Sequence, residues 1–235
     1  MHQPLKGKSA VVTGAGSGIG RAIALEFAQA GASLVLVGRT RATLEETARL
    51  AGNGKAVVAD VSDEGAVARM AAEAGPADIL VNNAGTFVWK RFTDLTTADW
   101  DRTLAVNLRG TFLCCKAFVP GMIDRKAGVI LNLGSIHGLE GDVNVAAQCA
   151  SKFGVIGLTQ ALSRELRPHQ VRVNAICPGS VDPLADRRKP PLSRKILPAE
   201  VAGLARFLAS DEAAAITGAS FEIHGATGTM IQVNA

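Results

Sequence analysis

Short apolar segments recur along the whole chain, and within them apolar residues do not alternate with polar ones. Seven are rich in valine, isoleucine and leucine, and they span residues 9–14, 33–38, 55–60, 78–83, 128–133, 171–176 and 220–225. Uniformly apolar runs of this length are typical of parallel strands that are buried on both faces. The pattern therefore predicts seven strands.

Segments with helical spacing separate these strands. Ile19, Ile23 and Phe27 recur at steps of four, and two longer helices are expected over residues 97–122 and 148–167. Strands that alternate with helices are typical of parallel sheets joined by right-handed crossovers. The sequence thus predicts an α/β protein with a doubly wound Rossmann-type fold, in which helices cover both faces of a seven-stranded parallel sheet.

No linker interrupts this alternation, so we expect one dinucleotide-binding domain over residues 1–235 that also carries the substrate site. One stretch is irregular. Residues 179–198 contain several prolines and no strand or helix pattern. Long loops inside compact domains are often functional, and we interpret this one as a lid on the substrate side.

Composition narrows the class of protein. The chain is 48% hydrophobic and 20% charged, with 25 glycines, as expected of a compact soluble protein. We expect a cytoplasmic protein, because no membrane span or secretory signal is recognisable, and the four cysteines lack metal-site spacing. Much of the net charge of +4 lies within residues 186–195, so neither nucleic acid nor a membrane is indicated as a partner.

A glycine-rich turn, "TGAGSGIG", follows the first strand and leads directly into a helix. Glycines allow a tight turn and a close backbone approach, and the start of the helix attracts a pyrophosphate group. The candidate cofactor-binding residues of this turn are Gly14, Ser17, Gly18, Ile19 and Gly20. The motif alone leaves open a tight turn that binds nothing.

Further motifs follow in a characteristic order. They are Asp60-Val61, "NNAG" at residues 82–85, Asn107 in "VNLRG", Ser135 in "LNLGSIHG", Lys152 in "ASK" and Pro178-Gly179. With the glycine turn they cover almost the whole chain, which resembles the short-chain dehydrogenase/reductase family. The resemblance implies a nicotinamide cofactor and hydride transfer to or from a small carbonyl, imine or alcohol substrate.

The resemblance also assigns cofactor contacts. Asp60 is expected to bind the adenine amino group and Val61 the adenine ring, while Pro178-Gly179 borders the nicotinamide. Three residues, Asn83, Ala84 and Gly85, are expected to line the cofactor. For Asp60 the alternative is an acid that caps the following helix. In the family a threonine often follows the proline of this motif by five residues, but here Pro183 stands there.

The end of the second strand predicts which nicotinamide cofactor binds. An acid there accepts hydrogen bonds from the ribose of NAD, whereas an arginine favours the additional phosphate of NADP. This chain has Gly38 where the acid often stands, followed by Arg39 and Arg41. NADP(H) is therefore favoured over NAD(H), although both arginines could also be solvated at a helix start.

The catalytic pattern departs from the family at one position. Relatives use a serine, a tyrosine and a lysine, assisted by an asparagine that places the lysine through water; Ser135, Lys152 and Asn107 match three of these. The tyrosine position is Gln148, and the chain contains no tyrosine at all. A glutamine amide donates hydrogen bonds but releases no proton near neutral pH. We therefore expect poor turnover on ordinary ketones.

Two further features concern the substrate. His137 is a candidate substrate contact or replacement proton donor, because histidine titrates near neutrality. Five basic residues of the predicted lid suggest an anionic substrate, with a mobile solvated loop as the alternative. They are Arg187, Arg188, Lys189, Arg194 and Lys195.

Three functions remain open from the sequence. The first is an NADP-dependent oxidoreductase whose small-molecule substrate needs little help with protonation. The second is a catalytically silent NADP(H)-binding protein that acts as a sensor or oligomer subunit, and the third is a form of an active enzyme whose tyrosine has been replaced. The helices over residues 97–122 and 148–167 resemble those through which relatives form dimers and tetramers, so a homo-oligomer is expected.

Overall fold

The computed structural model of the protein describes residues 3–226 and contains a seven-stranded parallel sheet. Its strands are β1 (Ser9–Thr13), β2 (Ser33–Gly38), β3 (Lys55–Val58), β4 (Ile79–Asn82), β5 (Gly128–Leu133), β6 (Val171–Pro178) and β7 (Ser220–Ile223). They lie in the order β3-β2-β1-β4-β5-β6-β7, with every neighbouring pair parallel. The predicted fold class is confirmed, because each of the seven apolar segments forms a strand.

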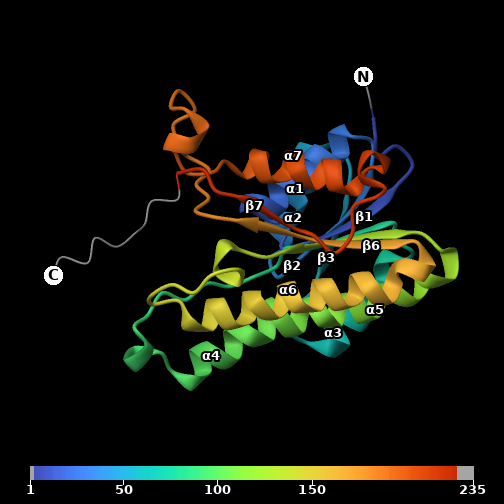
Figure 1. The fold of residues 1–235 in the computed structure, drawn as a ribbon. Coiled ribbons are helices and arrows are strands. Elements are labelled where there is room, and N and C mark those ends of the chain that lie inside the picture. The colour runs from blue at the N-terminus through green and yellow to red at the C-terminus, as the bar shows by residue number, and fades with distance from the viewer. Residues whose placement is uncertain (1–2, 227–235) are drawn as a thin grey trace.

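Helices cover both faces of the sheet (Figure 1). On one face lie α1 (Gly18–Gln29), α2 (Arg41–Ala51) and α7 (Pro198–Ala209); on the other lie α3 (Glu64–Ala74), α4 (Thr97–Leu104), α5 (Gly110–Arg125) and α6 (Ala146–Leu166). The first layer buries Ile23 and Phe27, and the second buries Met70 and Met122. In the described part of the chain, no helix is both long and apolar enough to cross a membrane.

The helix predicted over residues 97–122 is interrupted in the structure. Thr96 caps α4 through a reciprocal pair of hydrogen bonds with Asp99. A π-helical turn, Ala105–Arg109, then joins α4 to α5, and α5 extends to Arg125. Such turns are often found at functional sites, and this one contains Asn107. The second predicted helix begins slightly earlier, at Ala146, and ends at Leu166.

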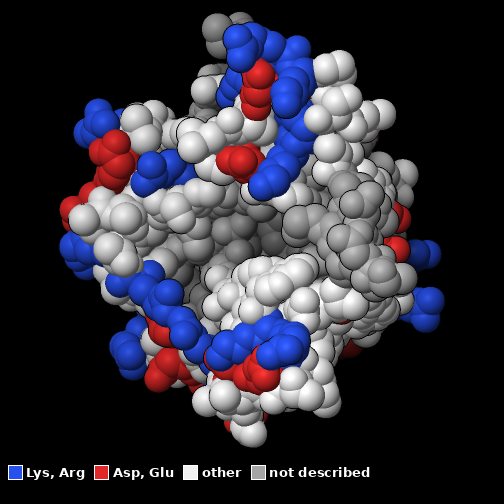
Figure 2. Space-filling view, turned by 90° about the vertical axis from the view of Figure 1, so that its left-hand side faces the viewer, with Lys and Arg blue, Asp and Glu red and all other residues white. Residues whose placement is uncertain are grey.

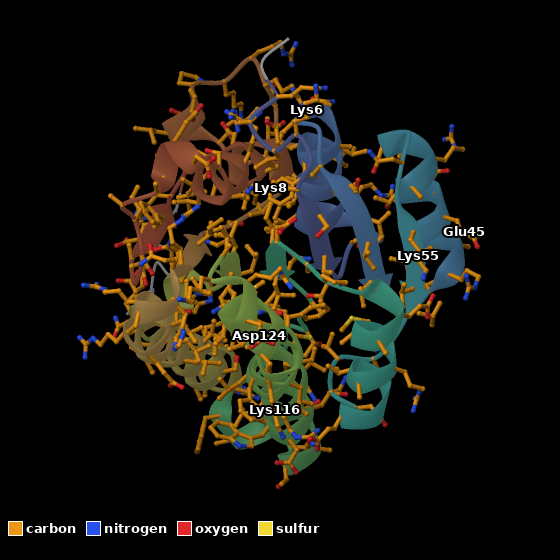
Figure 3. All side chains as sticks on the ribbon, turned by 90° about the vertical axis from the view of Figure 1, so that its right-hand side faces the viewer. Lys6, Lys8, Glu45, Lys55, Lys116 and Asp124 are labelled. Atoms are coloured by element: carbon orange, nitrogen blue, oxygen red, sulfur yellow. The ribbon has the colours of Figure 1, made fainter. Side chains whose placement is uncertain are left out.

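The order of the strands places a crevice at one edge of the sheet. The chain fills the sheet from β1 outward through β2 and β3, and then returns to place β4 on the other side of β1. Ligands of doubly wound proteins bind where the strand order reverses, beyond the carboxyl ends of the strands. Figure 2 shows this edge with a hollow at its centre and basic side chains on its rim. Figure 3 shows the opposite edge, where Lys8 and Lys55 lie at the starts of β1 and β3.

The predicted lid is a partly ordered loop. A β-bridge joins Val181 to Ile196, and Pro191–Ser193 form a short 3-10 turn between them. Arg194 makes two hydrogen bonds to Glu200, at 2.9 and 2.8 Å. The loop ends one residue earlier than predicted, because Pro198 is the first residue of α7, a position that suits proline.

Candidate active site

A cleft of about 390 Å³ lies at the carboxyl ends of β1, β2, β3 and β4. Most of the cofactor-binding residues predicted from the sequence line it: Gly14, Ser17, Gly18, Ile19, Arg39, Asp60, Val61, Asn83, Ala84 and Gly85. These residues come from four separate segments, and the parallel sheet brings them to one edge.

The glycine turn packs tightly against the end of β4. A Cβ atom on Gly20 would lie 2.2 Å from the Gly14 carbonyl oxygen and 2.4 Å from Asn83 Nδ2. Asn83 Nδ2 in turn donates to the carbonyl oxygens of Thr13 and Gly14, at 2.9 and 3.3 Å. Gly14 has a φ of +66°, which glycine adopts at little cost. Gly20 therefore supports the wall of the cleft from behind and does not line it.

The start of α1 faces the cleft through Ser17 and Gly18. Ser17 is the N-cap residue but makes no side-chain capping bond, and the first turn of α1 contains no acidic residue. Uncapped backbone N–H groups and the helix dipole together favour an anion such as a pyrophosphate. The glycine-rich turn therefore connects β1 to α1 tightly and also has a surface that suits the pyrophosphate of a dinucleotide.

Asp60 lies in the cleft and does not cap α3. The cap is Asp63, whose Oδ1 accepts from the Ala66 N–H at 2.5 Å, so the alternative interpretation of Asp60 is wrong. Asp60 Oδ1 accepts from the hydroxyl and backbone N–H of Ser62, at 2.7 and 2.9 Å. These bonds, aided by more distant arginine charges, hold the pKa of Asp60 below its usual value. Its carboxylate is therefore ionised at neutral pH and suited to accept a hydrogen bond from an adenine amino group.

The two arginines after β2 occupy different surroundings. Arg39 lines the cleft and makes no hydrogen bond or ion pair with any other residue that the structure describes. Arg41 instead lies 3.7 Å from Glu45 on the exposed side of α2 and is not part of the cleft lining. Of these two arginines, only Arg39 lines the cleft.

Gln148 lies next to this cleft on α6, and 8% of its surface is exposed. Its Oε1 accepts a hydrogen bond of 3.0 Å from Asn107 Nδ2. Asn107 is also bound to the backbone of Thr86, which lines the cleft. The fold therefore brings Asn107 and Gln148 together beside the cleft. Neither residue is part of the cleft lining formed by the predicted cofactor-binding residues.

Lys152 lies one turn further along α6 and is almost fully buried. Its Nζ donates to the carbonyl oxygen of Leu133, at 2.5 Å. Burial in a poorly solvated position lowers the pKa of Lys152 to about 8. Its ammonium group is charged at pH 7 but can lose its proton within the range in which many enzymes work.

The remaining predicted residues lie on neighbouring loops. Ser135 follows β5, and its hydroxyl accepts from the His137 N–H at 3.2 Å. The His137 ring is mostly buried, with Nε2 3.7 Å from Asp142 Oδ2. Pro178 ends β6, and Gly179 donates its N–H to the Ile223 carbonyl oxygen at 2.9 Å. None of these four predicted residues lines the nucleotide cleft itself.

Known proteins resemble this chain in both sequence and overall fold. Residues 8–191 match the family model described as short chain dehydrogenase. The chain belongs to the short-chain dehydrogenase family. It is 36% identical to 2-(S)-hydroxypropyl-CoM dehydrogenase 3 of Xanthobacter autotrophicus, over 96% of this chain and 98% of the relative. It is 40% identical to D-threitol dehydrogenase of Mycolicibacterium smegmatis, over 94% and 93% of the two chains.

Solved structures agree with this assignment. A short chain dehydrogenase/reductase family protein superimposes with a TM-score of 0.89 at 34% identity, covering 94% of this chain and 97% of the other. Membership of the short-chain dehydrogenase family makes the protein an oxidoreductase of this type and implies a nicotinamide cofactor, NAD or NADP. Relatives named as dehydrogenases also favour an enzyme over a catalytically silent protein.

Several residues of this short-chain dehydrogenase cleft were missed from the sequence. Thr86, Arg102 and Val106 line it alongside Gly16, Gly38, Thr40, Thr43, Leu44 and Ala59. Some were recognisable as neighbours of predicted residues, such as Gly16 within the glycine turn. Arg102 and Val106 were not, because Arg102 lies on α4 and Val106 on the π-helical turn after it, and both reach the cleft only through the packing of these elements against the sheet.

Proposed function

We propose that this short-chain dehydrogenase is an NADP(H)-dependent oxidoreductase that transfers hydride to or from a small carbonyl, imine or alcohol. The observation that carries the choice of cofactor is Arg39, which lines the cleft and forms no hydrogen bond or ion pair within residues 3–226, while Gly38 stands where an acid is usual. A guanidinium group binds phosphate oxygens in a bidentate manner. A carboxylate in its place would repel the 2′-phosphate of NADP.

Each residue of the site has a proposed role. A bound nicotinamide cofactor supplies or accepts the hydride. The Ser135 hydroxyl and Gln148 amide hold the reacting group of the substrate, while Lys152 binds the nicotinamide ribose through its ammonium group. Asn107 holds the Gln148 amide by a direct hydrogen bond and, by resemblance, takes part in the water chain to Lys152.

Gln148 separates this site from that of an ordinary alcohol dehydrogenase. An amide has no proton to transfer near neutrality, and a positioned general acid contributes about 100- to 10,000-fold to rate. The proposed substrates are therefore those with little need of protonation by the protein, such as an iminium ion or an activated carbonyl. His137, close to Asp142, is the candidate proton donor for other substrates.

The lid supports an anionic substrate through fewer residues than the sequence predicted. Arg188 pairs with Asp186 at 3.0 Å, Arg194 pairs with Glu200, and Lys195 lies 3.9 Å from Asp182. These three charges are partly neutralised within or next to the loop. Recruitment of an anion would then depend on the two lid cations that form no ion pair in the described part of the chain, Arg187 and Lys189.

Association with further copies of the chain is also part of the proposal. Phe112 on α5 and Phe153 on α6 are each 46% exposed. Exposed large apolar side chains that form a contiguous patch are typical of interaction sites. They lie on the two helices expected from the resemblance to pair in a homodimer or homotetramer.

The decisive experiment compares the wild type with Gln148→Tyr and Gln148→Phe. Oxidation of NADPH and NADH is followed spectroscopically with matched ketones, preformed imines and activated dicarbonyls. The wild type should consume NADPH faster with imines than with ketones, and Gln148→Tyr should raise the ketone rate about 100-fold or more. Gln148→Phe adds the ring without the hydroxyl and should give no increase.

Two results would contradict the proposal. If neither nicotinamide cofactor binds at millimolar concentration, the nucleotide site has been misassigned. If the wild type reduces simple ketones as fast as Gln148→Tyr does, another group already supplies the proton and Gln148 is not the limiting feature.

A further inference from the structure

The side chain of Asn107 is held in one orientation by the backbone of Thr86. Its Oδ1 accepts from the Thr86 N–H at 2.8 Å, and its Nδ2 donates to the Thr86 carbonyl oxygen at 3.1 Å. A backbone N–H can only donate and a carbonyl oxygen can only accept. This pair of bonds therefore fixes which end of the Asn107 amide is nitrogen, an assignment that geometry alone often leaves ambiguous.

The fixed nitrogen in turn orients Gln148. Asn107 Nδ2 lies 3.0 Å from Gln148 Oε1 and 3.1 Å from Ser151 Oγ. One Nδ2 proton serves the Thr86 carbonyl and the other lies between the Gln148 and Ser151 oxygens; since Nδ2 can only donate, the Gln148 atom that faces it is the amide oxygen. Ser151 is consistent with this arrangement, because its hydroxyl donates to the Gln148 backbone carbonyl at 2.9 Å and leaves its oxygen to face Asn107.

The other end of the Gln148 amide is left without a protein partner. Across residues 3–226, the Gln148 side chain is hydrogen-bonded through Oε1, and no group accepts a hydrogen bond from its Nε2. Asn107 is 1% exposed and Gln148 is 8% exposed, so water competes little for the bonds between them. Nε2 is not sealed from solvent, so a ligand that supplies an acceptor replaces water there, whereas a ligand without one leaves the donor unpaired.

We infer that Asn107 is a positioning residue that holds Gln148 Nε2 as a hydrogen-bond donor subsite for an oxygen acceptor of the substrate, a carbonyl or carboxylate oxygen. The inference rests on the proposed function, which places the reacting group of the substrate beside Gln148. It goes beyond that function by specifying that this subsite donates a hydrogen bond to the substrate and does not accept one from it.

The polarity distinguishes a ketone from the corresponding alcohol. A phenol hydroxyl both donates and accepts, so a tyrosine at this position could serve either compound. The amide nitrogen of Gln148 only donates, and its oxygen is already engaged by Asn107. An alcohol at this point would therefore find a donor for its oxygen but a less available acceptor for its proton.

The orientation can be tested without a substrate. The protein is labelled with 15N at the glutamine side chains, and the Gln148 signal is assigned by its loss in Gln148→Met. In the wild type, with and without NADPH, the Gln148 amide protons should exchange rapidly with water. Asn107→Asp offers an acceptor in place of the donor, so the Gln148 amide should turn towards it and its protons should exchange at least about tenfold more slowly.

Ser151→Ala is the matched control. It removes another acceptor of the same Asn107 nitrogen, but it leaves Thr86 and Gln148 in place. Its Gln148 protons should exchange as in the wild type. Slow exchange in the wild type that becomes faster in Asn107→Asp would overturn the inference, because the nitrogen would then already face Asn107.

A second experiment tests the polarity with ligands. Binding of cyclohexanone to the NADP⁺ complex and of cyclohexanol to the NADPH complex is measured by ligand-detected NMR. Gln148→Glu keeps the shape but replaces the donor by an acceptor. It should weaken cyclohexanone binding about three- to tenfold and leave cyclohexanol binding unchanged or stronger.

The outcomes separate the two proposals. Equal weakening of both ligands, or no affinity of the wild-type complex for cyclohexanone, would overturn the donor subsite. A failure of the protein to bind either nicotinamide cofactor would overturn the proposed function, and the exchange of the Gln148 protons would still report the orientation set by Asn107.

Discussion

The nucleotide half and the catalytic half of this site are built in different ways. The nucleotide half depends on backbone shape, because Gly20 must approach Gly14 and Asn83 more closely than a side chain allows. In the proposed function, the catalytic half depends on the functional group of one side chain, Gln148 on α6. The shape of the nucleotide half depends on several segments, so few single substitutions would change it. The function proposed for position 148 depends on one side chain, so one substitution can alter it.

The two halves also differ in the solvent exposure of their basic side chains. In the nucleotide half Arg39 is exposed and has no ion-pair partner among the described residues. In the catalytic half Lys152 is buried, and its pKa is lowered to about 8 by loss of solvation. A cofactor can therefore gain a strong contact from Arg39, while Lys152 holds a charge that the fold itself makes costly.

The largest expected effect comes from breaking the shape of the nucleotide half. Gly20→Val should lower the free energy of unfolding by about 3 kcal/mol, because its Cβ would overlap the Gly14 carbonyl. Cofactor affinity should fall with it, as measured by NADPH fluorescence. Gly203→Ala is the control, since α7 has open space at that position and the change should be neutral or slightly stabilising.

The next effect concerns the charge of the nucleotide half. Arg39→Asp should lower the ratio of NADPH to NADH affinity about 100-fold, or two steps of about 1.4 kcal/mol, because it replaces a phosphate contact by repulsion. Titration of cofactor fluorescence measures both affinities. Arg41→Asp adds the same charge outside the cleft and should change the ratio far less; an equal effect would show that Arg39 has no direct contact.

In the catalytic half, burial of Lys152 predicts a dependence of stability on pH. Below pH 8 this lysine is protonated in both the folded and unfolded states, so the full cost of burying its charge is present. Between pH 8 and the unfolded pKa of 10.5 only the unfolded state keeps the proton, and stability therefore rises with pH. The contribution should reach about 2 kcal/mol between pH 7 and 9.5.

Urea unfolding of the wild type and Lys152→Met at the two pH values isolates this contribution. The difference between the two proteins cancels other groups that titrate in the same range, including the buried thiols of Cys114 and Cys115, whose pKa values burial raises to about 12. A difference that does not change with pH would mean that Lys152 is better solvated than its position indicates.

The smallest expected effect comes from the N-terminal cap of α4, a helix next to both halves of the site. Thr96→Ala removes the cap of α4, the helix that carries Arg102 to the nucleotide half and leads into the turn that holds Asn107. It should cost about 1 kcal/mol of unfolding free energy. Thr93→Ala, in the exposed turn before α4, is the control. NADPH affinity and the exchange of the Gln148 amide protons should change together if α4 supports both halves.

Much of the fold followed from local pattern. Parallel strands buried on both faces give uniformly apolar runs, so all seven could be recognised from the sequence. The π-helical turn at Ala105–Arg109 could not, because no residue type specifies it and it depends on how α4 and α5 pack. The role of Arg194 was also missed, since its partner Glu200 lies in the next helix and the pairing depends on the path of the loop.

The sequence by itself determined the strand and helix order, the family, and the absence of a tyrosine hydroxyl at position 148. These depend on residue identity and spacing, which are fixed along the chain. Only the tertiary structure decided which arginine lines the cleft and which way the Gln148 amide faces. Both depend on contacts between segments far apart in the sequence, such as those of Asn107 with Thr86 and Gln148, and an amide has two chemically different ends that only its neighbours can distinguish.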